Sequence, residues 1–297
     1  MIEFIPNVSE GRRPDVVDAL VRALCSEPEV RLLDRTTDAS HHRSVFTTVG
    51  PADALLRAAL ALLDEAIARI DLRQHQGVHP RVGAVDVMPF VPLGSTAMAE
   101  CIDLARRVGA EAAARFGLPV FLYEEAATRP ERRRLENIRR GEFEGLAAKL
   151  ADPAWTPDFG PASPHPTAGA LVVGARHVLI AFNVNLATPR VEIARAIAAR
   201  IREHGGGLPA VKAIGVALAD RGIVQVSMNL VDYTRTAPAA AFEAVQRHAR
   251  TFGVEIVESE LIGLIPQAAL AGTSARALRL TGFTDDRILE VRLARVS

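Results

Sequence analysis

The chain has 297 residues, more than one hydrophobic core usually organises, so two domains of roughly 100–200 residues each are expected. Hydrophobic residues make up 49% of the chain and charged residues 24%, which excludes a disordered, collagen-like or coiled-coil protein. Thirty-five basic residues balance thirty-five acidic ones, so the sequence lacks the net positive charge typical of proteins that bind nucleic acid or acidic membranes.

The two cysteines, Cys25 and Cys101, form no CxxC pair and predict neither a disulfide framework nor a cysteine zinc site. The N-terminus lacks a basic start and a long apolar core, so no signal or transit peptide is expected. Charged residues interrupt the longest apolar stretch, residues 52–70, and no membrane span is expected. These features predict a soluble cytoplasmic protein.

The first half of the chain alternates strand and helix patterns. Residues 2–5 predict a strand that Pro6 ends, and Pro14 opens an amphipathic helix. Strands over 30–34 and 44–49, a helix over 52–70 and a strand over 82–91 follow, then a helix over 96–116 and a strand over 119–122. This βαββαβ order with an added helix and strand is typical of the ferredoxin-like unit.

The second half repeats that order after one or two charged helices within 130–150. Strands are predicted over 178–185, 211–218, 223–230 and 254–257, with helices over 191–203 and 238–252, and residues 288–293 predict a last strand in the second sheet. We therefore expect an α+β fold of two ferredoxin-like (βαββαβ) subdomains, residues 1–177 and 178–297. We expect a ligand cleft between these duplicated units.

His75 and His79 precede an apolar strand. Their spacing is found in zinc-binding helices, but Gly77 between them and Pro80 after them oppose a helix, so no metal site is predicted. A histidine in a loop that enters a core strand is well placed for proton transfer near neutral pH. The alternative is a loop histidine that merely caps the strand.

Two further segments allow two interpretations each. Residues 158–169 (DFGPASPHPTAG) have too many prolines and glycines for a helix, and form either a linker or a stiff loop whose glycines approach a flat ligand closely. Residues 129–140 (RPERRRLENIRR) hold six arginines, which form either a solvated helix face or a grip on a carboxylate-rich ligand.

Eight segments carry a resemblance to a known family. They are PNVSEG (6–11), HHRSV (41–45), HQGVHPR (75–81), AVDVMPF (84–90), WTPDFGP (155–161), LIAFNVNL (179–186), QVSMNL (225–230) and LIGLIP (261–266). In this order they resemble the formiminotransferase family, which includes the formiminotransferase part of formiminotransferase-cyclodeaminase. His42 and Thr36 depart from the residues common in that family, Asn and, in the animal enzymes, Asp.

The resemblance implies two ferredoxin-like subdomains with folate between them and His79 as the catalytic acid and base. It also implies a folate-binding loop made of Gly160, Pro161, Ala162, Ser163, Pro164, His165, Pro166, Thr167, Ala168 and Gly169. Arg43, Arg81, Asn183 and Asn185 are weaker candidates for positioning substrate carboxylates and amides. A homodimer is the family expectation.

The implied reaction moves the formimino group from N-formimino-L-glutamate to N5 of tetrahydrofolate, the co-substrate, without a metal. His79 would take the proton from N5 and give it to the leaving nitrogen of glutamate. Formyl transfer between 5-formyltetrahydrofolate and glutamate and a non-catalytic folate-binding protein are the alternatives; the HxGxHP setting of His79 favours an enzyme. No helical cyclodeaminase domain follows, so we expect no such activity.

Overall fold

The structure, a computed structural model, describes residues 1–39, 41–77 and 79–296. The chain divides into two compact units, Met1–Arg176 and His177–Ser297, and each is described by itself. Within the described residues, no helix is both long enough and apolar enough to cross a membrane.

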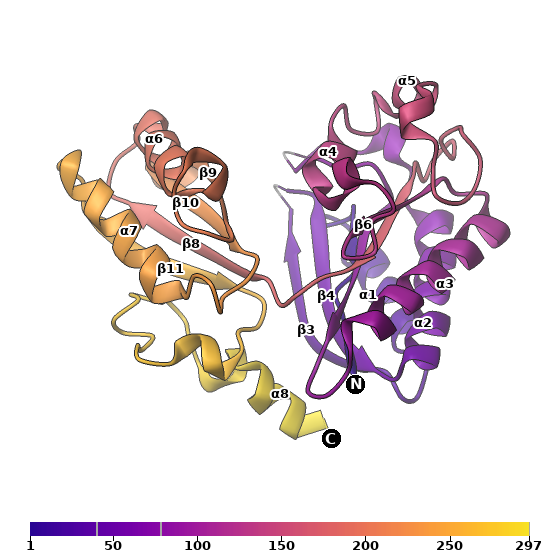
Figure 1. Cartoon of the computed structure of the whole chain (residues 1–297), viewed down its shortest axis with the longest axis horizontal. Coiled ribbons are helices and arrows are strands. Elements are labelled where there is room, and N and C mark those ends of the chain that lie inside the picture. Colours follow the sequence, from indigo (N-terminus) through magenta and orange to yellow (C-terminus); the bar gives the residue numbers. More distant parts are fainter. Residues whose placement is uncertain (40, 78, 297) are drawn as a thin grey trace. The chain divides into compact units, whose positions relative to one another are not determined.

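A mixed seven-stranded sheet forms the centre of the first unit (Figure 1). Ile5 and Pro6 divide its first strand into β1 (Ile2–Phe4) and β2 (Asn7–Val8), which pair antiparallel with β4 (Arg43–Gly50) on one side and β5 (Val85–Pro92) on the other. β3 (Arg31–Asp38) pairs with β4 at one edge. Beyond β5, β7 (Leu171–Ala175) and β6 (Val120–Glu124) extend the sheet in parallel.

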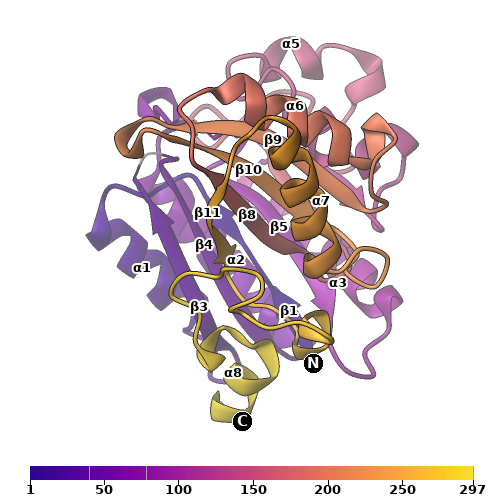
Figure 2. The same cartoon turned by 90° about the vertical axis from the view of Figure 1, so that its left-hand side faces the viewer.

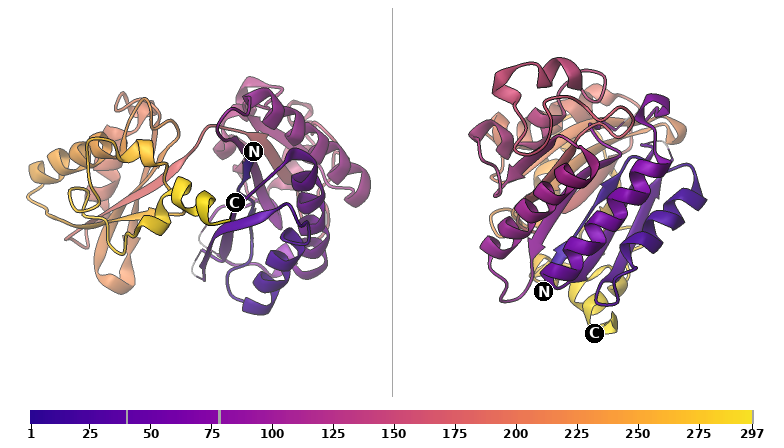
Figure 3. Two further views of the ribbon diagram at one scale, coloured as in Figure 1. Left: turned by 90° about the horizontal axis from the view of Figure 1, so that it is seen from below. Right: turned by 90° about the vertical axis from the view of Figure 1, so that its right-hand side faces the viewer.

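Three long helices cover one face of this sheet (Figure 3, right). They are α1 (Pro14–Leu24), α2 (Ala52–Arg69) and α3 (Met98–Phe116). Each places its apolar residues at helical spacing toward the sheet, and the first begins with proline, which suits a first helical turn. α3 ends at Gly117, whose φ of 64° closes the last turn.

A smaller layer covers part of the opposite face. It contains the short helices η2 (Pro130–Arg133), α4 (Leu135–Arg139) and α5 (Leu146–Leu150), and η3 (Pro153–Trp155) follows them in the chain. The short helix η1 (Leu72–Gln74) lies earlier in the chain, between α2 and β5. Ile138 and Leu146 from this layer pack with Phe121 and Val172 of the sheet. The sheet is therefore buried on both faces here, which explains the nearly continuous apolar sequence of β5 and β7.

The second unit is a four-stranded antiparallel sheet in the order β11-β8-β10-β9, with two helices over one face (Figure 2). The elements run β8 (Ile180–Leu186), α6 (Val191–Ile201), β9 (Val211–Leu218), β10 (Ile223–Leu230), α7 (Pro238–Thr251) and β11 (Ile256–Ile262). The 3-10 turns η4 (Glu203–Gly205), η5 (Ala219–Arg221), η6 (Gln267–Leu270) and η7 (Asp285–Arg287) lie between or after them. Both units thus have βαββαβ order, and the predicted α+β class is confirmed.

One sequence prediction about an element is wrong, and one strand was not predicted. Residues 288–293 were expected to form a strand, but Leu289–Val296 is helix α8, and its apolar residues 289 and 293 are four residues apart, as on one face of a helix. The strand β7 was missed because its five apolar residues directly follow the proline-rich loop. It lies between two parallel neighbours, where no alternation of polar residues marks a strand.

Candidate active site

A β-bulge places the carboxylate of Asp86 within the first unit. Neighbouring Asn7 and Val8 of β2 pair with Val87 and Val85 of β5, which leaves Asp86 as the extra residue. Bulges of this kind redirect one side chain. Asp86 is fully buried, and its Oδ1 accepts a hydrogen bond from the Val82 backbone N–H at 2.8 Å.

Two arginines share the other oxygen of Asp86. Arg43 Nη1 donates to Oδ2 at 2.8 Å and Arg139 Nη2 donates to the same atom at 2.5 Å. Asn7 Oδ1 accepts from Arg43 Nη2 at 2.9 Å, which fixes the guanidinium across β2. Burial alone would raise the pKa of Asp86, but the charges of Arg139 and Arg43 hold that pKa below its ordinary value.

His79 is half-buried beside this cluster. Its Nδ1 lies 2.8 Å from the carbonyl oxygen of Pro80, so Nδ1 carries the proton and Nε2 keeps its lone pair. Burial, and then the positive charges of Arg43 and Arg139, lower the pKa of His79 to about 3, against the effect of Asp86. The ring is therefore neutral at physiological pH, as a proton acceptor must be.

His75 is held by both ring nitrogens. Its Nδ1 accepts a hydrogen bond from Arg81 Nε at 3.0 Å, so its Nε2 donates to the His42 carbonyl at 3.0 Å. The His42 ring stacks on it with centroids 4.2 Å apart, and His42 Nε2 lies 3.2 Å from Glu10 Oε1. Both ring nitrogens of His75 are thus occupied, which gives it a structural role.

Gly77 allows the loop that carries His75 and His79 to pass close to His41 and His42. A Cβ at this position would lie 2.5 Å from the His41 carbonyl oxygen and 2.8 Å from the His42 Cβ. Only glycine permits the two loops to pass so closely. In the same region, the His41 and His79 rings lie 6.2 Å apart between centroids.

Arg81 joins two loops of the first unit. Its Nη1 and Nη2 donate to Glu142 and to both carboxylate oxygens of Glu144, at 2.7–2.9 Å, while its Nε holds His75. All three nitrogens are therefore engaged by the protein. The geometry favours an anchor for the loop around His75 over the predicted contact with substrate.

The proline-rich loop ends in a tight turn. His165 and Gly169 exchange two backbone hydrogen bonds of 2.9 and 3.0 Å, and His165 Nδ1 accepts from the Ala168 N–H at 3.0 Å. Gly160 and Gly169 have φ of 85° and 71°, and a Cβ on either would lie 2.1 Å from a backbone oxygen, of Leu118 and of Val82. These glycines are required by contacts with the protein's own backbone.

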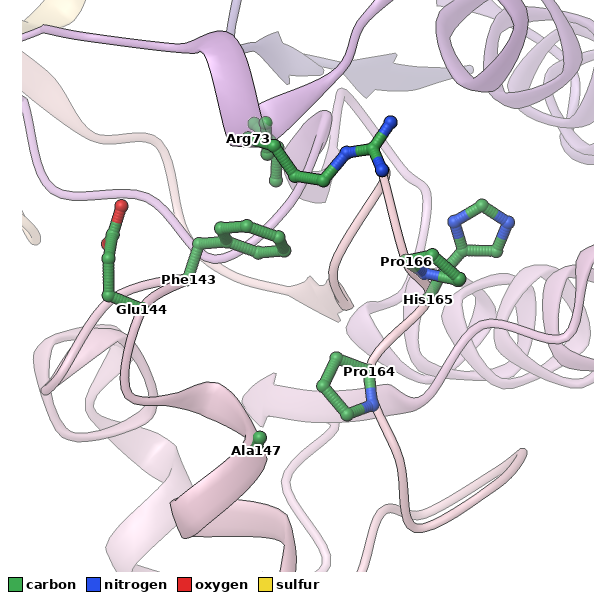
Figure 4. Close-up of a pocket in the computed structure, with 8 residues that line it drawn as sticks. Arg73, Phe143, Glu144, Ala147, Pro164, His165 and Pro166 are labelled. Carbon is green, nitrogen blue, oxygen red and sulfur yellow. The ribbon is translucent and has the colours of Figure 1, made fainter.

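A cavity of about 350 Å³ opens beside this loop (Figure 4). Phe143 points into it, Arg73 borders it, and Pro164 and Pro166 line it from the loop. Residues 164–166 of the predicted folate loop share this cavity with the Phe143 ring, the Glu144 carboxylate and Arg73, whose guanidinium pairs with Asp71. The aromatic ring is suited to contact with a flat ligand.

Asn183 and Asn185 lie in the second unit, on the face of its sheet opposite the side chains of its apolar core. Asn185 Nδ2 donates to Glu260 at 2.8 Å and to Glu258 at 3.1 Å, while its Oδ1 accepts from Gln225 at 2.9 Å. Asn185 is thus held in place by neighbouring strands. This face is polar: its amides can donate or accept hydrogen bonds, and its carboxylates can accept them.

The arginine-rich segment does not form one solvated helix face. Arg132 is fully buried, where it pairs with Asp158 at 2.8 Å and lies over the Phe121 ring, 5.2 Å from its centroid. Arg133 is exposed and pairs with Glu125 at 2.6 Å, whereas Arg139 reaches Asp86. The solvated interpretation is wrong for Arg132 and Arg139 because short helices turn these two side chains inward.

Sequence reasoning missed the roles of Asp86 and Arg139. A single carboxylate inside an otherwise apolar strand is a signal, since a buried charge persists only with partners. Arg139 carried no such signal among its neighbouring arginines. In the described ranges no group of three or more histidine, cysteine, aspartate or glutamate side chains could hold a metal, and the metal-free prediction stays a prediction.

The fold and this site define a class: an α+β protein of two ferredoxin-like units. In the first unit, a neutral histidine suited to proton transfer lies beside a pair of arginines. The chain belongs to the formiminotransferase family. Residues 1–176 match its N-terminal subdomain, and residues 181–280 match the formiminotransferase domain.

Curated relatives match along nearly the whole chain. A glutamate formimidoyltransferase of Streptococcus pyogenes is 46% identical over 95% of both chains. One of Thermoplasma acidophilum is 43% identical over 100% of this chain and 98% of its own. The formimidoyltransferase-cyclodeaminase of Rattus norvegicus is 41% identical over 93% of this chain, which spans about half (52%) of that longer protein.

Proposed function

We propose that the protein is an enzyme that transfers the formimino group of N-formimino-L-glutamate to N5 of tetrahydrofolate. The products are 5-formiminotetrahydrofolate and L-glutamate. The observation that carries this proposal is the neutral His79 ring, whose Nδ1 bonds to Pro80 and whose Nε2 keeps a lone pair. The names of the full-length relatives support it.

The chemistry needs one proton carrier. N5 attacks the formimino carbon, a C–N bond forms, and N5 gives its proton to Nε2 of His79. The tetrahedral intermediate then breaks its bond to the glutamate nitrogen, which receives the proton from the same ring. Atoms and charge balance without a metal or a covalent intermediate, and binding both substrates together supplies the orientation.

The folate site is assigned to the loop from Gly160 to Gly169. Its middle part, residues 164–166, lines the cavity that Phe143 enters, which supports contact with the flat part of folate (Figure 4). The loop is already closed by the paired backbone bonds of His165 and Gly169, so it loses little conformational entropy on binding.

A direct assay tests the reaction. Purified protein is given tetrahydrofolate with either N-formimino-L-glutamate or N-formyl-L-glutamate, and release of L-glutamate and the folate product are followed by mass spectrometry. We expect formimino transfer to be faster by about 10²-fold. Faster formyl transfer would select the alternative reaction, and folate binding without glutamate release from either donor would indicate a binding protein.

Other expectations stay predictions, namely a homodimer, a cytoplasmic location and the absence of nucleic-acid partners. The predicted cleft between the two units also stays a prediction. Sedimentation velocity of the full chain measures the oligomeric state directly.

A further inference from the structure

The Asp86 cluster has more positive than negative charge. Both Arg43 and Arg139 donate to the same oxygen, Oδ2, while the other oxygen of Asp86 accepts from a neutral backbone N–H. In the described contacts, the two arginines therefore share a single carboxylate. Arg43 is buried and the Arg139 side chain is 14% exposed.

Such an excess charge is costly unless an anion completes it. Arg139 also has an unused donor: its Nε is buried and, within the part of the chain that the structure describes, has no hydrogen-bond partner. Asp86 fixes Nη2 of the same planar group, so the guanidinium cannot turn freely to find water. The cluster is arranged as a site for one further anionic group.

We propose that Arg139 is a specificity-determining residue that, together with Arg43, binds the α-carboxylate of the amino-acid donor. This assignment rests on the proposed function. It names a contact with substrate for a residue in α4 that is 60 positions along the chain from His79.

The chemistry of the substrates selects this carboxylate. In N-formimino-L-glutamate the α-carboxylate is attached to the carbon that bears the leaving nitrogen. When His79 contacts that nitrogen, the α-carboxylate must lie beside it. The carboxylates of folate are instead separated from N5 by the whole p-aminobenzoyl group, so they cannot reach the same place while N5 reacts.

The charge of the donor also suits the histidine. The charged groups that act on His79 are Arg43 on β4, Arg139 on α4 and Asp86 on β5, and the His41 ring lies 6.2 Å away between centroids. An α-carboxylate between the arginines offsets their positive charge and therefore raises the pKa of His79, while burial, the largest cause of the lowered pKa, remains. A proton carrier works best when its pKa lies near the working pH.

A matched pair of ligands tests the assignment without turnover. N-formyl-L-glutamate and 4-formamidobutanoate differ only in the α-carboxylate, and their binding to the full chain is measured by calorimetry without folate. We expect the wild type to prefer the first by about 10- to 100-fold, the range of a charged hydrogen bond. Arg139→Gln should reduce this preference to less than about threefold, with tetrahydrofolate affinity unchanged.

Arg133→Gln is the matched control, because Arg133 is an exposed arginine of the same segment, paired with Glu125. It should keep the wild-type preference. If Arg139→Gln does not fold, Arg139→Lys keeps the charge but loses the planar donor pair, and should reduce the preference partly.

Three results would overturn the assignment. They are a wild type that binds both ligands equally, a variant that keeps the preference, and a variant that loses affinity for both ligands and for folate to the same extent. Failure of the proposed function differs from these outcomes, because it appears as no formimino transfer by the wild type whatever the ligand preference.

Discussion

His75 and His79 lie four residues apart in one loop, yet their ring nitrogens have different partners. Arg81 and the His42 carbonyl occupy both nitrogens of His75, whereas Pro80 occupies only Nδ1 of His79. The sequence shows two equivalent candidates with near-neutral reference pKa. The hydrogen-bond partners, of which only the His42 carbonyl comes from a distant segment, determine which ring can accept a proton.

A second titratable group in the first unit allows a pH prediction. Glu3 on β1 is 4% exposed and its Oε2 has no hydrogen-bond partner among the described residues. Burial raises the pKa of Glu3 to about 7, against the charge of Arg176. Between pH 4.5 and 7 the folded state thus binds more protons than the unfolded state, so this group's contribution to stability falls as the pH rises.

Glu3→Gln should remove that dependence. We expect the variant to match the wild type in stability at pH 5 and to exceed it at pH 8 by about 1–3 kcal/mol, because the amide needs no ionisation. Urea unfolding at both pH values gives the difference. Equal stability of the two proteins at pH 8 would show that Glu3 is ionised at no cost in the folded state.

At the scale of elements, the glycines of the proline-rich loop support the fold. Gly169 has φ of 71° and would place a Cβ 2.1 Å from the Val82 oxygen, which accepts a hydrogen bond from Ala170. Gly169→Ala should therefore lower stability by about 2–4 kcal/mol. Gly206→Ala is the control, since Gly206 has φ of 79° but open space around its Cβ, and it should cost about 1–2 kcal/mol.

Thermal unfolding measures both variants. A Gly169→Ala protein as stable as the Gly206→Ala protein would mean that the loop shifts to make room. A loss of folate affinity counts as a ligand effect only where these scans show that stability is kept.

In the segment from η2 to α4, neighbouring arginines differ in burial and therefore in their effect on stability. Arg132→Gln should destabilise the protein by about 3–5 kcal/mol, because it leaves Asp158 buried without its cation. Arg133→Gln removes only a surface pair and should change stability by less than about 1 kcal/mol. Chemical denaturation distinguishes the two, and similar effects would contradict the burial of Arg132.

For the whole molecule, local pattern was enough to predict the duplicated βαββαβ order, since each helix and strand carries its own periodicity. It was not enough for β7, whose strand character depends on parallel neighbours far along the chain. The Asp86 cluster also depends on long-range pairing, because the bulge in β5 exists only opposite β2. His79 was recognised from its motif, whereas the role of Arg139 became visible only from its contact with Asp86 in the folded chain.

The central claim is that His79 carries the proton in formimino transfer, and it is tested by turnover of the full chain with His79→Asn. We expect kcat to fall by about 10²–10⁴-fold, with tetrahydrofolate binding within about twofold of the wild type. His75→Gln, measured beside it, should lose stability but much less turnover per folded molecule. A His79→Asn protein within tenfold of the wild type, or equal losses in the two variants, would contradict the account.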